Sequence, residues 1–600
     1  MMKKSFFASA AVFAVLLAAG ASLFAADWKP ADGILLSKFA KDVDPSAPHP
    51  EYPRPQLVRS DWVNLNGLWD YAITPVSQSD PAPQGKILVP FPAESALSGI
   101  AKPVGKDNLL VYNRTFTIPK EWTGKHILLH FGAVDWKTTV TLNGKLLGEH
   151  KGGYDPFTFD ITDALADGEQ SITVTVWDPT KEEIAGDAPA GRQPVGKQLT
   201  NPGGIWYTPN TGIWQTVWME PVADAYIKSI NPVSDIKAKT MTFNFIVGGE
   251  SNGTFVAIGN QSVPVADGRA VITTAYPDAE LWSPSNPKLY DFTAELTKGG
   301  AVIDQVQSYF GMREVSLGKT DDGITRILLN GEFVFQHGPL DQGWWPDGLY
   351  TAPTDKALRF DLEMTKAFGF NMLRKHVKTE PDRFYRHCDE LGILVWQDMP
   401  SGDGYISPND PDFNRTSASA AQYEQEYAAM ISRLKSFPSI IMWVPFNEGW
   451  GQYDTERIVK MTNQLDPTRL VNCASGWTDR NCGSVHDKHC YPGPDMFEPE
   501  ENRATVLGEY GGLGFPVKGH SWKEDGNWGY VSFEDQENLF NKYNDLNNGL
   551  KELIKRGLSA AVYTQTTDCE IEVNGLMSYD REVIKMPVDK LAESNKALRE

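Results

Sequence analysis

A change of rhythm near residue 314 constrains the fold of this 600-residue chain more than any other feature. Beyond it, short apolar runs alternate with stretches whose apolar residues recur at helical spacing. Eight strand-like runs separated by helices are the pattern of a (β/α)8 barrel. The predicted strands are 333–336, 371–374, 393–396, 440–444, 469–472, 484–491, 504–507 and 560–563. The sequence therefore predicts a TIM barrel over residues 314–600.

One helix is predicted in detail, after the second of these strands. Thr379 is its expected N-cap and Pro381 lies in its first turn, where proline is tolerated because that N–H has no helical partner. Phe384, Cys388 and Leu391 then share one face. Cys388 is therefore predicted to be a core residue.

The chain before the barrel is predicted to be all β. Residues 27–222 contain short alternating strands, and the Asn143-Gly144 turn between two of them indicates a hairpin. This pattern favours a β-sandwich. Residues 223–313 form a smaller β segment, whose size and short strands are typical of an immunoglobulin-like sandwich.

The N-terminal 26 residues are typical of a secretory signal. Lys3 and Lys4 precede an apolar run, and small residues follow up to Ala26. We expect an exported, periplasmic or secreted protein. The five cysteines are an odd number, so a disulfide scaffold is not predicted. Whether Cys482 and Cys490 pair stays open, as does a zinc site made of those two cysteines with His486 and His489.

The net charge of −21 bears on possible partners. It argues against nucleic acid and against an anionic membrane surface, because both repel an acidic protein. A neutral or cationic ligand fits the balance better than a polyanion. No metal and no organic cofactor is predicted, and a homo-oligomer stays open.

Two glutamates carry the predicted chemistry. Glu448 follows the fourth predicted strand, and Glu509 follows the seventh. The C-terminal ends of barrel strands carry the working groups of such folds, so the two carboxylates are expected to face each other across the mouth. Paired carboxylates are what glycoside hydrolysis needs, one as acid/base and one as nucleophile. A surface ion pair is the alternative for either residue.

The motifs around these residues resemble those of glycoside hydrolase family 2, the β-galactosidase, β-glucuronidase and β-mannosidase group. The resemblance covers nearly the whole chain after the signal segment. It rests on VPFP (89–92), YNRTF (112–116), GGYDPF (152–157), GIWQTV (212–217), FNEG (446–449) and GEYG (508–511). It implies a jelly-roll sandwich, an immunoglobulin-like domain and a catalytic TIM barrel in this order.

The resemblance also implies roles for site residues. Glu448 is similar to the family's acid/base and Glu509 to its nucleophile. Asn447 would bond the sugar 2-hydroxyl, and Arg374 and Tyr491 would bond the nucleophile. Further expected substrate-binding residues around the barrel mouth are His376, His489, Trp477, Asp398 and Gln565, together with Asp341, Trp344 and Trp345 as a sugar subsite. For Trp477, a core position is the alternative.

Some positions depart from the family pattern. The third strand ends in 397–401 (QDMPS), which lacks part of the metal site of some family β-galactosidases. The barrel has no Asn-x-Lys motif like the one that grips a uronate carboxylate in family β-glucuronidases. The first-region loop that reaches the barrel is not fixed by the sequence, and 192–198 is a candidate.

The sequence thus predicts a retaining exo-β-glycosidase acting on a terminal, neutral sugar, with galactose as the leading hypothesis. β-Glucuronidase, β-mannosidase or arabinosidase specificity is the alternative among enzymes. A carbohydrate-binding protein with an inactive barrel is the alternative from another class. The intact Glu448 and Glu509 argue against it.

Overall fold

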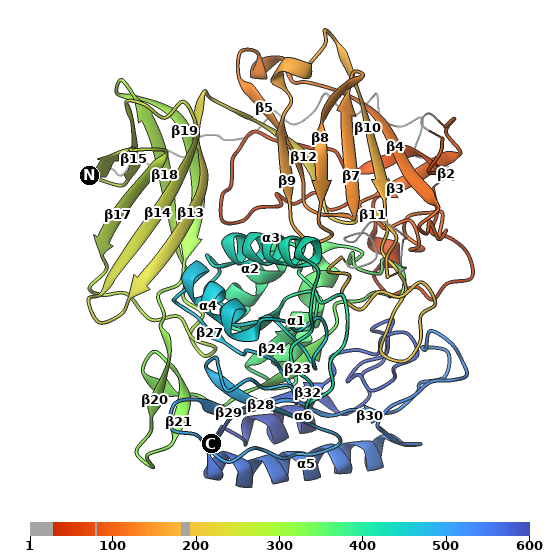
Figure 1. Ribbon diagram of the computed structural model, residues 1–600, viewed down its shortest axis with the longest axis vertical. Helices are drawn as coiled ribbons and strands as arrows, with labels where there is room; N and C mark the ends of the chain where they lie inside the picture. The colour runs from red at the N-terminus through yellow and green to blue at the C-terminus, as the bar shows by residue number, and fades with distance from the viewer. Residues whose placement is uncertain (1–27, 79–80, 182–192, 600) are drawn as a thin grey trace, which may run out of the picture.

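The computed structural model describes residues 28–78, 81–181 and 193–599 (Figure 1). The predicted signal segment 1–26 lies outside these residues. Two β-rich parts, orange and yellow-green in Figure 1, lie next to each other above a third part, which contains every α-helix of the described residues. Among the described residues, no helix has the length and apolar character needed to cross a membrane.

The first part is a sandwich of two antiparallel sheets, ordered β1-β12-β5-β9 and β3-β2-β4-β10-β7-β8, with a short pair β11-β6. The strands are β1 (Val63–Asn64), β2 (Gly67–Pro75), β3 (Gly85–Val89), β4 (Asn108–Thr117), β5 (His126–Phe131), β6 (Val134–Asp135), β7 (Lys137–Leu142), β8 (Lys145–Lys151), β9 (Phe157–Asp160), β10 (Glu169–Trp177), β11 (Gly212–Ile213) and β12 (Val217–Val222). The predicted hairpin is confirmed. Leu142 pairs with Lys145, and Asn143 and Gly144 both have positive φ, as a two-residue type I′ turn requires.

The second part is a smaller sandwich. Its sheets are β13-β14-β17 and β16-β15-β18-β19, and all pairings are antiparallel. The strands are β13 (Ala225–Asp235), β14 (Thr240–Gly249), β15 (Thr254–Ile258), β16 (Gln261–Pro264), β17 (Arg269–Ala275), β18 (Tyr290–Lys298) and β19 (Ala301–Phe310). Alternate residues of β14, such as Phe243 and Phe245, are buried between the sheets. This period of two places a single apolar face of each strand in the core.

The third part is a barrel of eight parallel strands, ordered β27-β26-β25-β24-β23-β32-β29-β28. The strands are β23 (Gln336–Asp341), β24 (Met372–Lys375), β25 (Leu394–Asp398), β26 (Ile440–Val444), β27 (Leu470–Val471), β28 (Val485–Cys490), β29 (Ala504–Gly511) and β32 (Leu558–Thr564). β27 and β28 are the two ends of the sheet. A backbone hydrogen bond of 2.7 Å from Ser484 N to Val471 O joins them, so the barrel is nearly closed.

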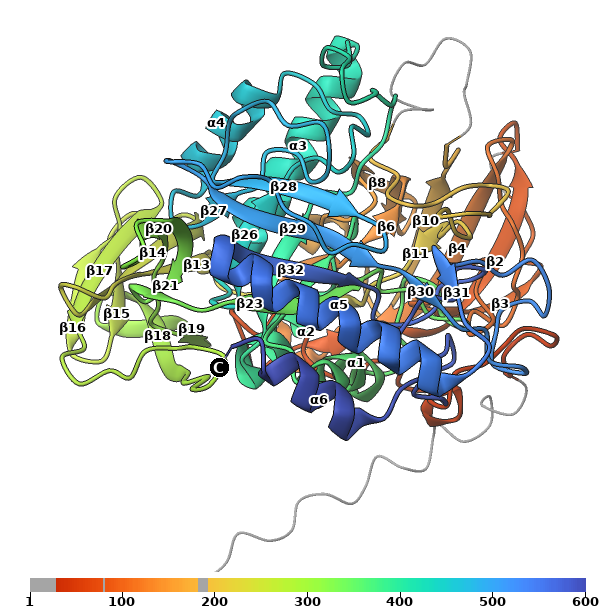
Figure 2. The same ribbon diagram turned by 90° about the horizontal axis from the view of Figure 1, so that it is seen from below.

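Helices cover the outside of this barrel, as Figure 2 shows for α5 beside β32 and β29. They are α1 (Asp355–Ala367), α2 (Asp382–Leu391), α3 (Ser417–Leu434), α4 (Thr455–Leu465), α5 (Gln536–Arg556) and α6 (Val588–Lys596). The side chains of Thr354, Thr416 and Asp535 cap α1, α3 and α5. Short strands β30 (Leu513–Gly514) and β31 (Val531–Ser532) lie between β29 and α5.

Two local predictions about the barrel are wrong. Thr379 does not cap α2, because Pro381 occupies the N-cap position with an extended ψ of 149°. Cys388 is fully buried, as predicted. The first barrel strand begins at Gln336, whereas Glu332–Phe333 (β22) pairs in a separate sheet with β20 (Val315–Lys319) and β21 (Thr325–Leu329). The apolar run 333–336 continues from one sheet into the other, and nothing in its sequence marks where the first strand ends and the second begins.

Candidate active site

The two glutamates meet at the C-terminal ends of the barrel strands. Glu509 lies within β29, while Glu448 follows the end of β26 in a left-handed conformation, with φ of 52°. A hydrogen bond of 2.9 Å from Glu448 N to Ser475 O holds this strained turn. A carboxylate oxygen of Glu448 and one of Glu509 lie within 4.8 Å of each other. This proximity suits a retaining pair, whose carboxyl groups stand about 5–5.5 Å apart.

The Glu509 carboxylate is buried and held by two donors. Arg374 Nη1 donates to Oε1 at 3.2 Å, and the Tyr491 hydroxyl donates to Oε2 at 2.6 Å. His376 Nε2 lies 4.0 Å from Oε1. Burial alone would raise the pKa of Glu509, but the nearby positive charges, chiefly His489 and Arg374, lower it to about 2. The Glu509 carboxylate is therefore ionised.

Arg374 is a fully buried hub on β24. Its guanidinium makes a bidentate contact with Asp398 at 3.0 and 2.9 Å and donates to Asn447 Oδ1 at 2.8 Å. Asp398 also contacts His376 Nδ1 at 2.9 Å. The predicted residues Arg374, His376, Asp398 and Asn447 are thus brought together around Glu509. A planar fork with five donors is suited to linking several acceptors in this way.

Glu448 is attached to a second chain of contacts. Its Oε1 lies 2.7 Å from His489 Nδ1, and His489 Nε2 lies 2.7 Å from Ser475 Oγ. Ser475 in turn donates to Asp487 Oδ2 at 2.5 Å. Burial lowers the pKa of His489, but the charges of Glu509, Glu448 and Asp487 outweigh burial and raise it. The protonated form of His489 is therefore favoured between the two glutamates.

Ser475 and Asp487 belong to the site but were not predicted from the sequence. Asp487 and His489 are two residues apart on β28, so they point to the same face of the strand. That period of two was the available signal for Asp487. Ser475 lies in the turn after β27 and had no comparable signal.

Three predicted subsite residues are not brought to the glutamates. The Asp341 carboxylate contacts Lys375 Nζ at 2.9 Å and Gly343 N at 2.9 Å in a buried ion-pair network. Trp344 packs in a core cluster with Tyr207 and Tyr350, and Trp345 is buried beneath Arg581. Adjacent tryptophans on a loop resemble a sugar platform in sequence, but here both rings fill the core.

The remaining two predicted residues lie near the site. The Trp477 ring is 41% exposed, and its centroid lies 5.8 Å from that of His489, so the core alternative for this ring is wrong. Gln565 follows β32, is fully buried and donates to Asn574 Oδ1 at 2.7 Å. The ring of Trp477 is thus available for stacking on a sugar.

One group of side chains in the described residues has a geometry that could hold a metal ion, and it consists of Glu448, His489 and Glu509. An ion there would occupy the position that the two carboxylates need for a sugar. The zinc set considered above does not form, because His486 contacts Glu500 and His489 contacts Glu448. Nor do Cys482 and Cys490 pair, since all five cysteines are free.

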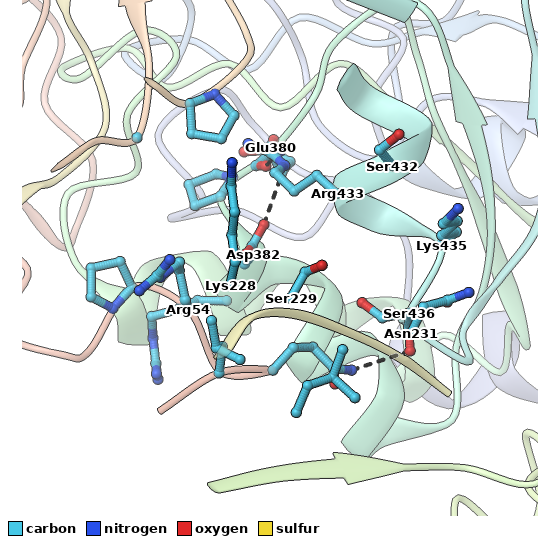
Figure 3. A pocket seen from close by; sticks show the side chains of 18 of the residues that line it. Arg54, Lys228, Ser229, Asn231, Glu380, Asp382, Ser432, Arg433, Lys435 and Ser436 are labelled. Atoms are coloured by element: carbon cyan, nitrogen blue, oxygen red, sulfur yellow. Dashed lines mark hydrogen bonds and ion pairs between the residues drawn. The ribbon is translucent and has the colours of Figure 1, made fainter. Parts of the chain in front are cut away.

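A separate cavity of about 840 Å³ lies where the three parts meet (Figure 3). Arg54 of the first part, Lys228 of the second and Arg433 of the barrel line it. The ion pair drawn in Figure 3 joins Arg433 to Asp382 at 3.3 Å. Neither Glu448 nor Glu509 lines this cavity, so it is a space between domains, distinct from the site at the strand ends.

Three stretches match family descriptions. Residues 89–188 match "Glycosyl hydrolases family 2, sugar binding domain", residues 225–313 match "Glycosyl hydrolases family 2", and residues 351–506 match "Glycosyl hydrolases family 2, TIM barrel domain". The chain belongs to glycoside hydrolase family 2. The predicted family is confirmed. So is the predicted fold class, which consists of a jelly-roll sandwich, an immunoglobulin-like sandwich and a TIM barrel.

Known family 2 proteins are similar over much of the chain. A putative β-glucuronidase of Formosa agariphila is 29% identical over 61% of this chain and 34% of its own length. A β-galactosidase of Thermoanaerobacter pseudethanolicus is 26% identical over 60% of this chain and 47% of its own length. The matches thus cover less than half of the length of either curated relative. The solved β-glucuronidase of Bifidobacterium dentium has a TM-score of 0.71 at 20% identity, covering 90% of this chain and 97% of that one, and supports the fold.

In this family 2 site, we expect Tyr491→Phe to reduce kcat by about 10- to 100-fold, because a hydrogen bond to the Glu509 carboxylate is lost. Losing a donor to the charged form also raises the pKa of Glu509. That pKa is depressed in the folded chain, so the ionised form of Glu509 is lost only as pH falls toward about 2. The variant's acid limb in a kcat/KM–pH profile should therefore move to higher pH.

Tyr543→Phe is the matched control for this variant. It removes a buried hydroxyl that donates to Asn595 Oδ1 at 2.7 Å, between α5 and α6. We expect this control to lose stability while the acid limb stays in place. An unchanged profile for Tyr491→Phe would contradict the role given to its hydroxyl.

The tryptophans give a second test of the site. We expect Trp477→Ala to raise KM by about 3- to 10-fold with little change in stability, because its ring is exposed beside His489. Trp344→Ala should instead lower the free energy of unfolding by about 3–5 kcal/mol, because its ring is buried. Steady-state kinetics and urea unfolding measure the two effects. A KM increase for Trp344→Ala without destabilisation would restore it as a subsite residue.

Proposed function

We propose that the chain is a retaining exo-β-glycosidase, with Glu448 as acid/base and Glu509 as nucleophile. The observation that carries the proposal is the approach of the two carboxylates to within 4.8 Å at the barrel mouth. The low pKa of Glu509 supports its role as the attacking carboxylate. The environment of Glu448 is different, since its contact is a histidine that can supply or receive a proton.

The proposed reaction has two steps. Glu509 attacks C1 of the terminal sugar while Glu448 donates a proton to the leaving oxygen, which gives a covalent glycosyl-enzyme. Glu448 then takes a proton from water as that water attacks C1, and the sugar leaves with its β configuration retained. Asn447 keeps its carbonyl oxygen on Arg374, so its amide N–H groups can serve the 2-hydroxyl.

Two substrate classes compete within this proposal. The absence of a barrel Asn-x-Lys motif favours a neutral sugar such as galactose, and one relative carries the name β-galactosidase. Relatives named β-glucuronidase favour a uronic acid instead. Both classes enter the test, together with β-mannosides and arabinosides.

The test combines turnover with covalent labelling. The chain is assayed on nitrophenyl β-galactoside, β-glucoside, β-glucuronide, β-galacturonide, β-mannoside and α-arabinoside. A 2-fluoro derivative of the best sugar is then used to trap the intermediate, and peptide mapping should place the label on Glu509. A label elsewhere would refute the assignment of the nucleophile. Sugar binding without turnover, unchanged in Glu509→Gln, would indicate a binding protein.

A further inference from the structure

A loop of the first part, residues 193–198, is seated on the C-terminal ends of barrel strands β24 and β25. Gly196 N donates to Ser401 O, just beyond β25, at 2.7 Å. A Cβ built on Gly196 would lie 3.0 Å from the carbonyl oxygen of Val377, just beyond β24. The loop is therefore packed tightly beside His376, one of the residues around the nucleophile.

Lys197 directly follows Gly196 in this loop, and its side chain is buried. The residue is only 5% exposed. Its ammonium lies 6.0 Å from the ring centroid of Trp450, two residues after Glu448, and 5.7 Å from that of Tyr207. The Lys197 charge reaches the catalytic residues. Burial lowers the pKa of His376 most, and the positive charge of Lys197 is the next largest cause that lowers it.

No hydrogen bond or ion pair joins the Lys197 ammonium to any residue in the part of the chain that the structure describes. Glu572 is close enough for Lys197 to lower its pKa, but its oxygens are engaged by the Tyr207 hydroxyl at 2.5 Å and Asn574 Nδ2 at 3.0 Å. Burial of an ammonium that lacks a direct ion pair is unfavourable, and the more distant carboxylates of Glu509 and Glu572 and the aromatic faces offset only part of the cost. The geometry thus calls for an anion from outside the chain.

We propose that Lys197 binds the carboxylate of a terminal β-linked hexuronic acid and so sets the specificity of the site. This inference rests on the proposed glycosidase function. In such a sugar the carboxylate is attached to C5, and C5 and C1 flank the same ring oxygen. A cation beside the nucleophile can therefore reach this group while Glu509 faces C1. A neutral sugar offers a hydroxymethyl group there, which leaves the charge of Lys197 uncompensated.

The proposal differs from the barrel Asn-x-Lys arrangement in the origin of the cation. The barrel of this chain lacks that motif, and the lysine comes from the first part. The gluco- and galacto-configured acids share the carboxylate, so Lys197 by itself does not distinguish them. The test includes both.

The experiment compares matched uronide and neutral substrates. Wild type and Lys197→Met are assayed on nitrophenyl β-glucuronide against β-glucoside, and on β-galacturonide against β-galactoside. We expect wild type to prefer one uronide, and Lys197→Met to lose about 10- to 100-fold in kcat/KM on it, mostly through KM. Activity on the neutral partner should change less than about 3-fold, and Lys197→Arg should recover part of the uronide activity.

Lys181→Met is the matched control. Lys181 belongs to the same part of the chain, and its ammonium lies 3.5 Å from the ring centroid of Trp206, which stacks on Trp450. The Lys181→Met substitution removes one positive charge beside the stacked rings of Trp206 and Trp450, which Lys197 also approaches. We expect no uronide-selective loss in this variant. A selective loss equal to that of Lys197→Met would refute a specific role for Lys197.

Binding without turnover gives a second readout. Glu509→Gln, with and without Lys197→Met, is titrated calorimetrically with glucuronate, galacturonate, glucose and galactose. Binding of one uronate that is lost with Lys197→Met supports the proposal. Equal kinetic losses on uronide and neutral substrate would overturn it, since Lys197 would then act on Glu509. Wild-type preference for a neutral glycoside would also overturn it while the glycosidase function stands, whereas a lack of turnover on every substrate would refute that function.

Discussion

Glu509→Ala is expected to reduce kcat/KM on the preferred aryl β-glycoside by a factor on the order of 10⁴ or more, since the covalent step loses its nucleophile. Sodium azide should restore turnover, because the missing carboxylate leaves room for a small anion on the same side of C1. The product should be the α-glycosyl azide, formed by one inversion. Product analysis by NMR, with rates measured against azide concentration, checks the prediction.

Glu448→Ala provides the matched control for this experiment. Here Glu509 still forms the glycosyl-enzyme, and azide replaces water in the second step. Two inversions then give the β-glycosyl azide. If the two variants gave the opposite products, the roles of Glu448 and Glu509 would be reversed.

Arg374→Met has the second largest expected effect. The change leaves Asp398 and Glu509 buried without their shared counter-ion and removes the donor to Asn447. Breaking one side of a buried ion pair costs about 3–5 kcal/mol, because an uncompensated charge stays in the interior. We therefore expect a loss of that size in the free energy of unfolding, together with a large fall in kcat. Urea unfolding and steady-state kinetics measure the two.

Arg581→Met separates the structural effect from the catalytic one. Arg581 is also fully buried and pairs with Asp361 at 2.9 Å, but it packs over Trp345 instead of Glu509. A similar loss of stability with nearly normal kcat is expected. If both variants lost kcat equally, the effect of Arg374 on activity would follow from stability alone.

The barrel and its carboxylates could be predicted because each depends on local sequence. The run 440–444 is apolar throughout, as a strand buried on both faces must be, and the structure places β26 over these residues. Glu448 and Glu509 follow from the rule that working groups stand at strand ends. The Asn143-Gly144 turn could be predicted for a similar reason, since few residue pairs tolerate two positive φ angles.

What could not be predicted depends on side-chain direction and on distant contacts. Trp344 and Trp345 look equally suited to a core or to a sugar platform, and only packing against Tyr207 and Arg581 decides. Lys197 is one of many lysines in a chain with a net charge of −21. That acidic balance favoured a neutral or cationic ligand, but surface charges more than about a Debye length away are screened, so the net charge does not predict the preference of a buried site.

The seating of residues 193–198 on the barrel has a consequence for how such chains diversify. If domains were exchanged between relatives as independent modules, the incoming first domain would bring its own loop to the mouth of an unrelated barrel. Gly196 fits between Val377 and the hydroxyls of Tyr154 and Tyr350 with no room for a Cβ. A foreign loop would therefore have to match that shape as well as supply a charge. The fit of this loop thus couples the first domain to the barrel, and with Lys197 in the role proposed above, substrate preference can change in a domain that holds neither Glu448 nor Glu509.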